Sequence, residues 1–334
     1  SKEFLKTDGT KPLRLKTETL YRSKGIDLRL GTTVVGIDRA RRAVCDSKGR
    51  WLDFDHLVLA LGARNRRLEI DDVNQESILE LRDLAQSRNF LGRLGSLSHV
   101  TIIGGGFIGL EASAFLREKG IGVDIVELAD RLMARSVSLP TSDYYLDLHR
   151  QLGATIHLDA QVKAVRRTAE RLKIEVSNGR IITSDAVLLA AGVVPNVEIA
   201  SRAGLQTANG ILVNQRLTTS DQHISAIGDC ALFPCSHSRG MVRLESIQNS
   251  TDQARYLSRI LTSKEPSAPY SSLPWFWSNQ GSSRLQIAGV GTGHDRAVMR
   301  GDPNYSRFSV LLYRAGRLIA VESVNWAADH LAAR

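Results

Sequence analysis

Apolar runs alternate with amphipathic stretches through the middle of this chain. Short apolar runs at 100–103 and 123–127 predict buried strands, and apolar positions at helical spacing over 107–119 and 140–152 predict helices. A further helix is expected near 77–89. Strands that alternate with helices are typical of a parallel sheet covered by helices. The middle of the chain therefore predicts an α/β domain.

The same apolar pattern occurs twice. Residues 25–37 match 153–165 in their apolar positions, and 49–62 match 179–192, with a Gly-Arg pair and a final glycine in each copy. We interpret the match as an internal duplication, because such repeats indicate related structural units. Only 24 residues precede Gly25. A glycine-rich unit belonging to the first copy is therefore expected upstream of Ser1, which would make this chain part of a longer protein.

The remaining segments predict a return to the first domain and a separate C-terminal domain. Residues 224–229 read as a short strand ending in Gly-Asp, and a helix is expected near 247–261. After a Pro/Ser-rich linker at 264–274, residues 285–324 alternate like an antiparallel sheet. We expect an α/β protein with two doubly wound dinucleotide-binding domains and a C-terminal α+β domain with an antiparallel sheet. The expected boundaries are 1–66 for the rear part of the first domain, 67–192 for the second, 193–269 for the returning segment and 270–334 for the C-terminal domain.

A complete dinucleotide fingerprint lies in the second copy. Gly104, Gly106 and Gly109 stand between an apolar strand and a helix, and Glu127 ends the next strand. The glycines allow a tight turn, close approach of the backbone to a pyrophosphate, and packing of helix on strand. A carboxylate at position 127 accepts the ribose hydroxyls of NADH and repels the 2′-phosphate of NADPH. NADH is therefore expected, although Arg131 and Arg135 leave NADPH open.

Composition and charge limit the classes of partner that the protein is expected to bind. The chain has 334 residues, a formal net charge of +9 and three cysteines. A basic protein attracts acidic partners, but its charges are scattered and not interleaved with aromatics, so nucleic acid is not the expected partner. No apolar run approaches the roughly 20 residues of a membrane span. The few cysteines suit a reducing cytoplasm, and the eight histidines occur singly, so no metal site is expected.

Several further motifs resemble one family. They are Ala-Leu-Gly62, Ala-Ala-Gly192, Ala226-Ile-Gly-Asp229, Arg243-Leu-Glu245, Gln248-Asn249, Leu273 to Gln280, Leu285 to Gly289, Val324-Asn325 and the opening Ser1-Lys2. Together they resemble the glutathione-reductase-like flavoproteins, and within them the NADH-dependent ferredoxin reductases of oxygenase systems. The resemblance covers essentially the whole chain. It implies an enzyme that takes a hydride from NADH onto the N5 atom of FAD and passes single electrons to an acidic [2Fe–2S] ferredoxin.

The resemblance also assigns roles to individual residues. It implies that Asp229 accepts hydrogen bonds from the ribityl chain of FAD, that Lys2 and Glu111 form an ion pair beside flavin N5, and that Trp277 lies at the flavin edge, where electrons leave. Asn279 and Leu61 depart from the residues that are usual in the family. The cofactor-binding residues that it implies, beside those of the fingerprint and Trp277, are Ala60, Gly62, Gly192, Gly228, Asp229, Glu245 and Gln248.

Three other functions stay open at this point. One is a non-catalytic flavoprotein of the apoptosis-inducing-factor type, which binds NADH and nucleic acid. Another is an NADH oxidase or peroxidase, which needs a reactive cysteine; Cys230 and Cys235 follow the Gly-Asp strand and stand in the wrong place for a redox pair. The last is a fragment that binds NADH without flavin.

Overall fold

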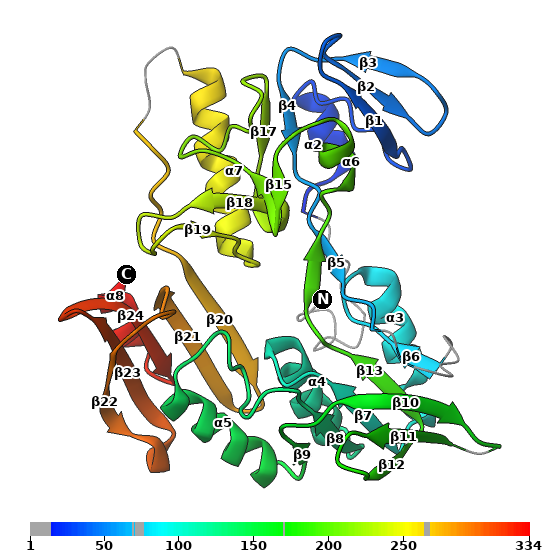
Figure 1. Cartoon of the computed structure of the whole chain (residues 1–334), viewed down its shortest axis with the longest axis vertical. Helices are drawn as coiled ribbons and strands as arrows, with labels where there is room; N and C mark the ends of the chain where they lie inside the picture. Colours follow the sequence, from blue (N-terminus) through cyan, green and yellow to red (C-terminus); the bar gives the residue numbers. More distant parts are fainter. Residues whose placement is uncertain (1–14, 69, 71–76, 170, 264–267) are drawn as a thin grey trace. The chain divides into compact units, whose positions relative to one another are not determined.

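The computed structural model describes residues 15–68, 70, 77–169, 171–263 and 268–334. The chain forms two compact units (Figure 1). Unit 1 comprises Ser1–Ala63, Pro195–Cys235 and Gly240–Tyr270, and unit 2 comprises Arg64–Val194, Ser236–Arg239 and Ser271–Arg334. β5 (Ala63–Asn65) and β14 (Val193–Pro195) pair where the chain passes from one unit to the other. The finer division into four segments stays a prediction.

Unit 1 contains a short parallel pair and a meander. β4 (Leu57–Leu59) pairs in parallel with β17 (Ile224–Ala226), and the apolar core around them includes Ile211, Ile224 and Phe233. The meander is the three-stranded antiparallel sheet β1–β2–β3. The other elements of unit 1 are β1 (Val34–Asp38), β2 (Ala43–Asp46), β3 (Trp51–Asp53), β15 (Thr207–Ala208), β16 (Gly210–Leu212), β18 (Ala231–Pro234), β19 (Met241–Val242), α2 (Glu18–Ser23), α6 (Glu198–Arg202) and α7 (Ile247–Thr262).

Unit 2 is built on a five-stranded parallel sheet in the order β6-β13-β7-β8-β9. Its central strands are rich in Val and Ile and are buried, as expected for strands covered on both faces. The elements are β6 (Ile78–Leu79), β7 (His99–Ile103), β8 (Gly122–Val126), β9 (Thr155–His157), β13 (Ala186–Leu189), α3 (Leu84–Arg93), the short 3₁₀ turn η2 (Leu94–Ser96), α4 (Phe107–Glu118) and α5 (Leu139–Gln151). The strands and helices expected over 100–127 and 140–152 are confirmed to within a residue or two.

The helix expected near 77–89 is only partly present. Ile78 and Leu79 form strand β6, which pairs in parallel with Val187 and Leu188. The helix begins at Leu84 because the Asp83 side chain accepts a hydrogen bond from the Gln86 N–H at 2.8 Å and caps it. Two apolar residues beside a free sheet edge gain more from pairing with β13 than from extending the helix, and the sequence pattern alone did not reveal that edge.

A second meander in unit 2 matches that of unit 1. β10 (Val162–Arg167), β11 (Leu172–Val176) and β12 (Ile181–Ser184) form an antiparallel sheet. The register shifts between Val162 and Ala164, at the position that corresponds to the shift between Val34 and Gly36 in β1. The bulge and the turn glycines of the two copies coincide, so the duplicated sequence pattern corresponds to a duplicated local structure.

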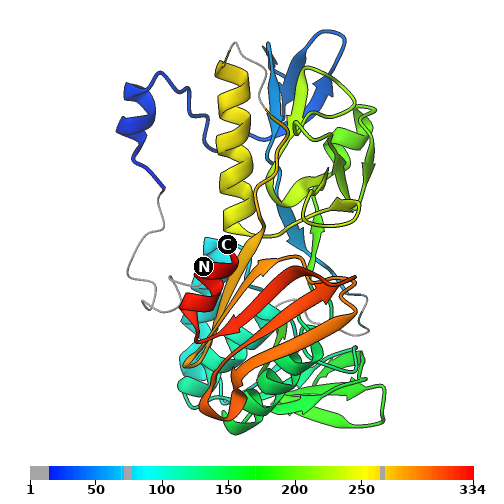
Figure 2. The ribbon, with the colours of Figure 1, turned by 90° about the vertical axis from the view of Figure 1, so that its left-hand side faces the viewer.

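The C-terminal sheet of unit 2 is antiparallel, in the order β20-β21-β24-β23-β22. This confirms the antiparallel sheet expected there. Helix α8 (Ala327–Ala333) contacts β21 and β24 (Figure 2). Glu322 joins this sheet to α5, because its carboxylate accepts hydrogen bonds from the Ser138 N–H (2.8 Å) and hydroxyl (2.6 Å) at the helix start. The strands are β20 (Trp275–Gln280), β21 (Ser283–Gly289), β22 (Arg296–Asp302), β23 (Arg307–Arg314) and β24 (Arg317–Val324).

Candidate functional site

The turn between β7 and α4 requires glycine at two positions. Gly104 has φ +111°, and a Cβ there would lie 2.4 Å from the carbonyl oxygen of Ala190. A Cβ on Gly109 would lie 2.1 Å from the carbonyl oxygen of Gly104. Both obstacles are backbone atoms that cannot move aside. The turn and the close packing of α4 on β7 therefore depend on the absence of side chains at these positions.

Gly106 differs from the other two glycines. It is the N-cap of α4, and a Cβ there would meet nothing within 4 Å. No side chain caps this helix end, so the first N–H groups of α4 point outward without a side-chain acceptor. Free N–H groups and the positive end of a helix dipole suit the pyrophosphate of a dinucleotide. The remaining reason for glycine at 106 is the space that a ligand needs, and this role stays a prediction.

Glu127 lies against the glycine turn. Its Oε2 accepts a hydrogen bond from the Gly105 N–H at 2.5 Å, and its Oε1 accepts one from the Ala129 N–H at 2.8 Å. A carboxylate oxygen accepts more than one hydrogen bond, so each oxygen can still receive a ribose hydroxyl. The carboxylate is thus held in place before any ligand arrives.

The guanidinium of Arg131 is held by backbone carbonyl groups. It donates to the carbonyl oxygens of Val137 (2.9 Å) and Ala134 (2.7 Å). A guanidinium that already holds two carbonyls is poorly placed to receive the 2′-phosphate of NADPH. The geometry of Glu127 and Arg131 therefore favours NADH.

Glycines follow the last strand of both copies. Gly62 has φ +64° and Gly192 has φ +87°, a region that favours glycine. In unit 1 the Gly62 carbonyl accepts a hydrogen bond from the Asn196 N–H (3.1 Å), and Leu61 O accepts one from Asn196 Nδ2 (2.8 Å). In unit 2 the Gly192 carbonyl accepts one from the Arg66 N–H (3.0 Å). These glycines let the chain turn out of each sheet.

Unit 1 gathers a second set of expected residues at one sheet edge. β4 and β17 run in parallel, so Ala60 and Gly62, which follow β4, reach the same carboxyl edge as Gly228 and Asp229, which follow β17. Ligands of doubly wound proteins bind at such an edge. The Gly228 N–H donates to Gln253 Oε1 at 2.7 Å, which ties the edge to α7.

Buried donors at this edge fit an acceptor-rich group such as FAD. Arg243 donates through its Nη1 to the carbonyl oxygen of Asp229 (3.1 Å), and its Nη2 lies 2.7 Å from Glu245 Oε1. Arg243 Nε and Gln253 Nε2 are buried and have no hydrogen-bond partner among the described residues. Unpartnered buried donors are costly unless a ligand or water supplies an acceptor. Both lie next to residues that the resemblance assigned to the flavin.

The start of α7 is capped and polar, as expected. Ser246 is the N-cap, and its hydroxyl accepts a hydrogen bond from the Asn249 N–H at 3.1 Å. Gln248 is 6% exposed, and its amide donates to Asp252 Oδ2 at 2.5 Å. Asn249 donates to the carbonyl oxygen of Leu244 at 3.2 Å. The helix end is thus held by its own side chains.

Glu111 lies in unit 2, on the second turn of α4. The Ser278 hydroxyl donates to Glu111 Oε1 at 2.6 Å. Ser278 in turn receives a hydrogen bond from Gln280 Nε2 (3.2 Å), and Gln280 Oε1 lies 2.9 Å from His149 Nε2. Burial lowers the pKa of His149, although its bond to Gln280 raises it in part, so the ring is neutral at pH 7. Lys2, the expected partner of Glu111, lies outside the described residues.

Trp277 lies on the other face of β20 from these residues. Side chains alternate along a strand, so Phe276, Ser278 and Gln280 share one face and Trp275 and Trp277 the other. The ring of Phe276 packs on Phe107 of α4, with centroids 4.6 Å apart. The rings of Trp275 and Trp277 lie 5.5 Å apart, and Trp275 also contacts His330 of α8. Trp277 therefore shares its sheet face with α8, and its role in electron exit stays a prediction.

Ser278, Gln280, His149 and Gln253 received no individual role from the sequence, although Ser278 and Gln280 stand in the motif Leu273 to Gln280. The signal for Ser278 and Gln280 was present, because three consecutive polar residues, 278–280, follow three aromatic residues within one strand. His149 and Gln253 gave no local signal, since their partners lie 131 and 25 residues away.

The cysteines do not form a reactive pair. Cys230 and Cys235 are buried, flank β18 and form no disulfide within the described residues. The Cys230 thiol faces the carbonyl oxygens of Ile227 and Leu59, at 3.3 and 3.6 Å, and burial raises its pKa. A thiol with a raised pKa is a poor nucleophile at neutral pH. In the part of the chain that the structure describes, no cluster of His, Cys, Asp or Glu could hold a metal ion. Among these same residues, every helix is too short or too polar to cross a membrane.

The fold and the glycine turn define the class of two-dinucleotide oxidoreductases. Residues 1–254 match the family model described as pyridine nucleotide-disulphide oxidoreductase, and residues 275–334 match the model described as reductase C-terminal. The chain belongs to the pyridine nucleotide-disulphide oxidoreductase family. This membership confirms the predicted fold class, with its dinucleotide-binding domains and additional C-terminal domain.

Individual similar proteins indicate a more specific group within this family. The chain is 41% identical to rhodocoxin reductase of Rhodococcus erythropolis, over 100% of this chain and 78% of that protein. It is 36% identical to putidaredoxin reductase of Pseudomonas putida, over 97% of this chain and 78% of that protein. The crystal structure of a ferredoxin reductase from Rhodopseudomonas palustris matches with a TM-score of 0.94 and 43% identity, covering 98% of this chain and 81% of that one. The resemblance to ferredoxin reductases that the motifs indicated is confirmed.

Proposed function

We propose that this protein takes a hydride from NADH onto FAD and passes electrons one at a time to a small [2Fe–2S] ferredoxin that serves an oxygenase. The observation that carries the proposal is the glycine turn of unit 2 closed by Glu127, on a chain that matches ferredoxin reductases along its whole length. FAD, when bound, supplies the exchange between a two-electron donor and a one-electron acceptor.

The residues of unit 2 bind and orient NADH. The free N–H groups at the start of α4 receive the pyrophosphate, and Glu127 accepts the ribose hydroxyls. Glu111 is held by Ser278, so its carboxylate has a defined position. Together with Lys2 it forms the proposed pair beside the flavin ring, where the ammonium stabilises negative charge that develops during reduction.

The residues of unit 1 hold FAD in the proposal. Ala60, Gly62 and Gly228 leave room for the cofactor at the carboxyl edge of β4 and β17, and Asp229 accepts hydrogen bonds from the ribityl chain. Glu245 keeps Arg243 in place through their ion pair, and Gln248 lies at the start of α7. Trp277 of unit 2 is the proposed exit for electrons.

The partner is proposed to be acidic. The net charge of +9 speeds encounter with a negatively charged ferredoxin more than it strengthens the complex. The apparent KM for ferredoxin should therefore rise with ionic strength. Three cysteines that form no disulfide within the described residues suit a reducing compartment, so we propose the cytoplasm as the location.

Ferredoxin-dependent turnover tests this function directly. The purified full-length protein should be yellow, should lose that colour anaerobically when NADH is added, and should reduce cytochrome c only when a [2Fe–2S] ferredoxin is present. NADH should be preferred to NADPH by at least about tenfold in kcat/KM, equivalent to about 1.4 kcal/mol. Salt-sensitive DNA binding without ferredoxin turnover would instead indicate the apoptosis-inducing-factor type, and a colourless protein that binds NADH would contradict the flavin.

Gly109→Ala tests the glycine turn. The added Cβ would meet Gly104 O at 2.1 Å, so the turn must shift and the NADH-dependent rate should fall about a hundredfold. Flavin content, measured from the visible spectrum, should not change, because FAD is assigned to unit 1. The matched control is Gly92→Ala on α3, where a Cβ meets nothing within 4 Å and the rate should stay within about twofold. Retained activity in Gly109→Ala would contradict the site.

A further inference from the structure

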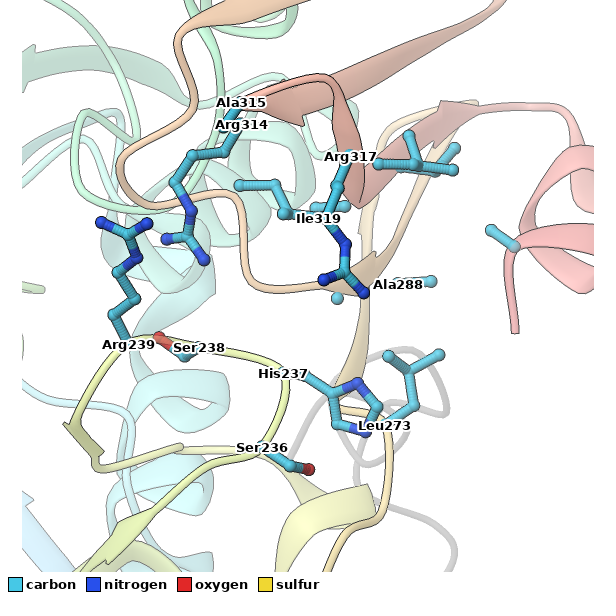
Figure 3. Close-up of a pocket in the computed structure, with 15 residues that line it drawn as sticks. Ser236, His237, Ser238, Arg239, Leu273, Ala288, Arg314, Ala315, Arg317 and Ile319 are labelled. Carbon is cyan, nitrogen blue, oxygen red and sulfur yellow. The ribbon is translucent and has the colours of Figure 1, made fainter.

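Unit 2 contains a basic pocket away from the glycine turn. The cavity has a volume of about 400 Å³ and is lined by the loop Ser236–Arg239, by the turn between β23 and β24, and by Leu273, Ala288 and Ile319 (Figure 3). A volume of this size holds a small organic ligand. None of the residues that the resemblance assigned to NADH or FAD lines this pocket.

Three arginines supply the charge of the pocket. In Figure 3 the guanidinium groups of Arg239 and Arg314 extend toward one another, and that of Arg317 extends from the β23–β24 turn toward Ala288. Among the described residues, none of the three side chains forms an ion pair or a hydrogen bond. The carboxylate of Asp295 accepts the Ala315 N–H of this turn at 2.7 Å, and it forms no ion pair with another described residue. The pocket therefore holds uncompensated positive charge.

The hairpin places two of these charges directly opposite each other. Arg314 pairs with Arg317 across β23 and β24, and the two-residue turn between them, Ala315 and Gly316, has φ +49° and +75°. This tight turn determines the register. Like charges at directly opposite positions destabilise a sheet. A bound anion would relieve that repulsion.

The rest of the lining defines the ligand further. The loop is pinned by His237, whose Nε2 lies 2.9 Å from the carbonyl oxygen of Ser271, and the hydroxyls of Ser236 and Ser238 line the same wall. Leu273, Ala288 and Ile319 form an apolar wall beside these polar groups. The ligand that fits has a compact apolar or ring-bearing body and an anionic group at one end.

We propose that this pocket binds a small phosphorylated organic molecule of about the size of a nucleoside monophosphate. Two or three guanidinium groups can share a phosphate monoester, which carries a charge of about −1.5 to −2 at pH 7 and three acceptor oxygens. A carboxylate carries a single charge and leaves more of the repulsion in place. The planar fork of arginine matches phosphate oxygens in pairs.

Titration calorimetry with adenosine 5′-monophosphate tests the proposal. The protein is loaded with FAD and saturated with NAD⁺, so that the probe cannot bind at the dinucleotide sites. One site should be observed, adenosine without phosphate should bind at least about tenfold more weakly, and Arg314→Gln and Arg317→Gln should each raise the Kd by at least about tenfold, equivalent to about 1.4 kcal/mol. The matched control is Arg296→Gln on β22, an exposed arginine of the same sheet outside this pocket, which should leave the Kd within about twofold.

Three results would overturn the proposal. One is the absence of binding up to about 10 mM probe, and another is an equal loss of affinity in Arg296→Gln, which would indicate attraction by net charge alone. A rise in the KM for ferredoxin in Arg314→Gln, with phosphate binding unchanged, would assign the pocket to the acidic protein partner instead. Thermal unfolding gives an independent readout: the probe should raise the Tm of the parent protein and not that of Arg317→Gln. NADH oxidation should be the same in all variants, so this test stands apart from the proposed function.

Discussion

The two meanders of this molecule share their local structure but not their burial. Val162 of β10 is 6% exposed and Ile182 of β12 is 7% exposed, whereas their counterparts Val34 and Leu52 in unit 1 are 42% and 46% exposed. The second meander packs against Ile103 and Val126 of the parallel sheet. The described residues of unit 1 contain no five-stranded parallel sheet beneath the first meander. Bulge, turn and register therefore follow from local sequence, while burial depends on what a sheet packs against.

The largest difference in stability between the two meanders is expected at the matched apolar positions Ile182 and Leu52. Ile182→Ala should destabilise the protein by about 2–3 kcal/mol, because it removes buried methyl groups and leaves a cavity. Leu52→Ala should change the free energy of unfolding by no more than about 0.5 kcal/mol, since that side chain is largely exposed. Urea unfolding followed by fluorescence measures both. Equal losses of free energy of unfolding in the two variants would show that the first meander is covered in solution, and would contradict the difference in burial.

A smaller difference in stability is expected at Asp185 and Asp55, the matched acidic residues that follow the two meanders. Asp185 accepts hydrogen bonds from the Ser98 hydroxyl (2.7 Å) and N–H (2.6 Å), the His99 N–H (2.8 Å) and Arg171 Nε (2.8 Å). Burial alone would raise the pKa of Asp185, but these bonds outweigh it and lower the pKa to about 2. Its counterpart Asp55 is exposed.

A native pKa below the unfolded value of about 3.9 means that Asp185 stabilises the protein above about pH 4, and that this contribution is lost as the pH falls toward 2. Asp185→Asn should therefore cost roughly 1–2 kcal/mol at pH 7 and much less near pH 2, while Asp55→Asn should have little effect at either pH. Unfolding curves recorded between pH 2 and 7 measure this. A pH-independent cost of Asp185→Asn would exclude the charged hydrogen bonds as its cause.

The smallest difference is expected at the turn glycines. Gly49 has φ +76° and Gly179 has φ +80°, and a Cβ at either position meets nothing within 4 Å. Alanine in this left-handed region costs about 1 kcal/mol from backbone strain alone. Gly49→Ala and Gly179→Ala should therefore have equal effects on thermal unfolding, within about 0.5 kcal/mol. Unequal effects would show that the turns, like the apolar faces, depend on their surroundings.

Much of the candidate site could be predicted because its signals are local. Gly104, Gly109 and Glu127 lie within one strand–helix–strand unit, and the structure explains both glycines by contacts within that unit or with the adjacent crossover at Ala190. The donor to the Glu127 carboxylate is the N–H of Gly105 in the same turn. Residues close in sequence meet whatever the rest of the chain does, so their spacing was sufficient.

By itself the sequence determined the alternation of strands and helices, the duplicated meander, the glycine turn and the family. Only the tertiary structure decided that residues 78–79 join a sheet edge, that Ser278 and Gln280 hold Glu111 and His149, and that Arg239 meets Arg314 and Arg317 in one pocket. The physical reason is that hydrogen bonds, packing and charge act over a few ångströms. Residues far apart in the sequence come within that range only when the chain has folded.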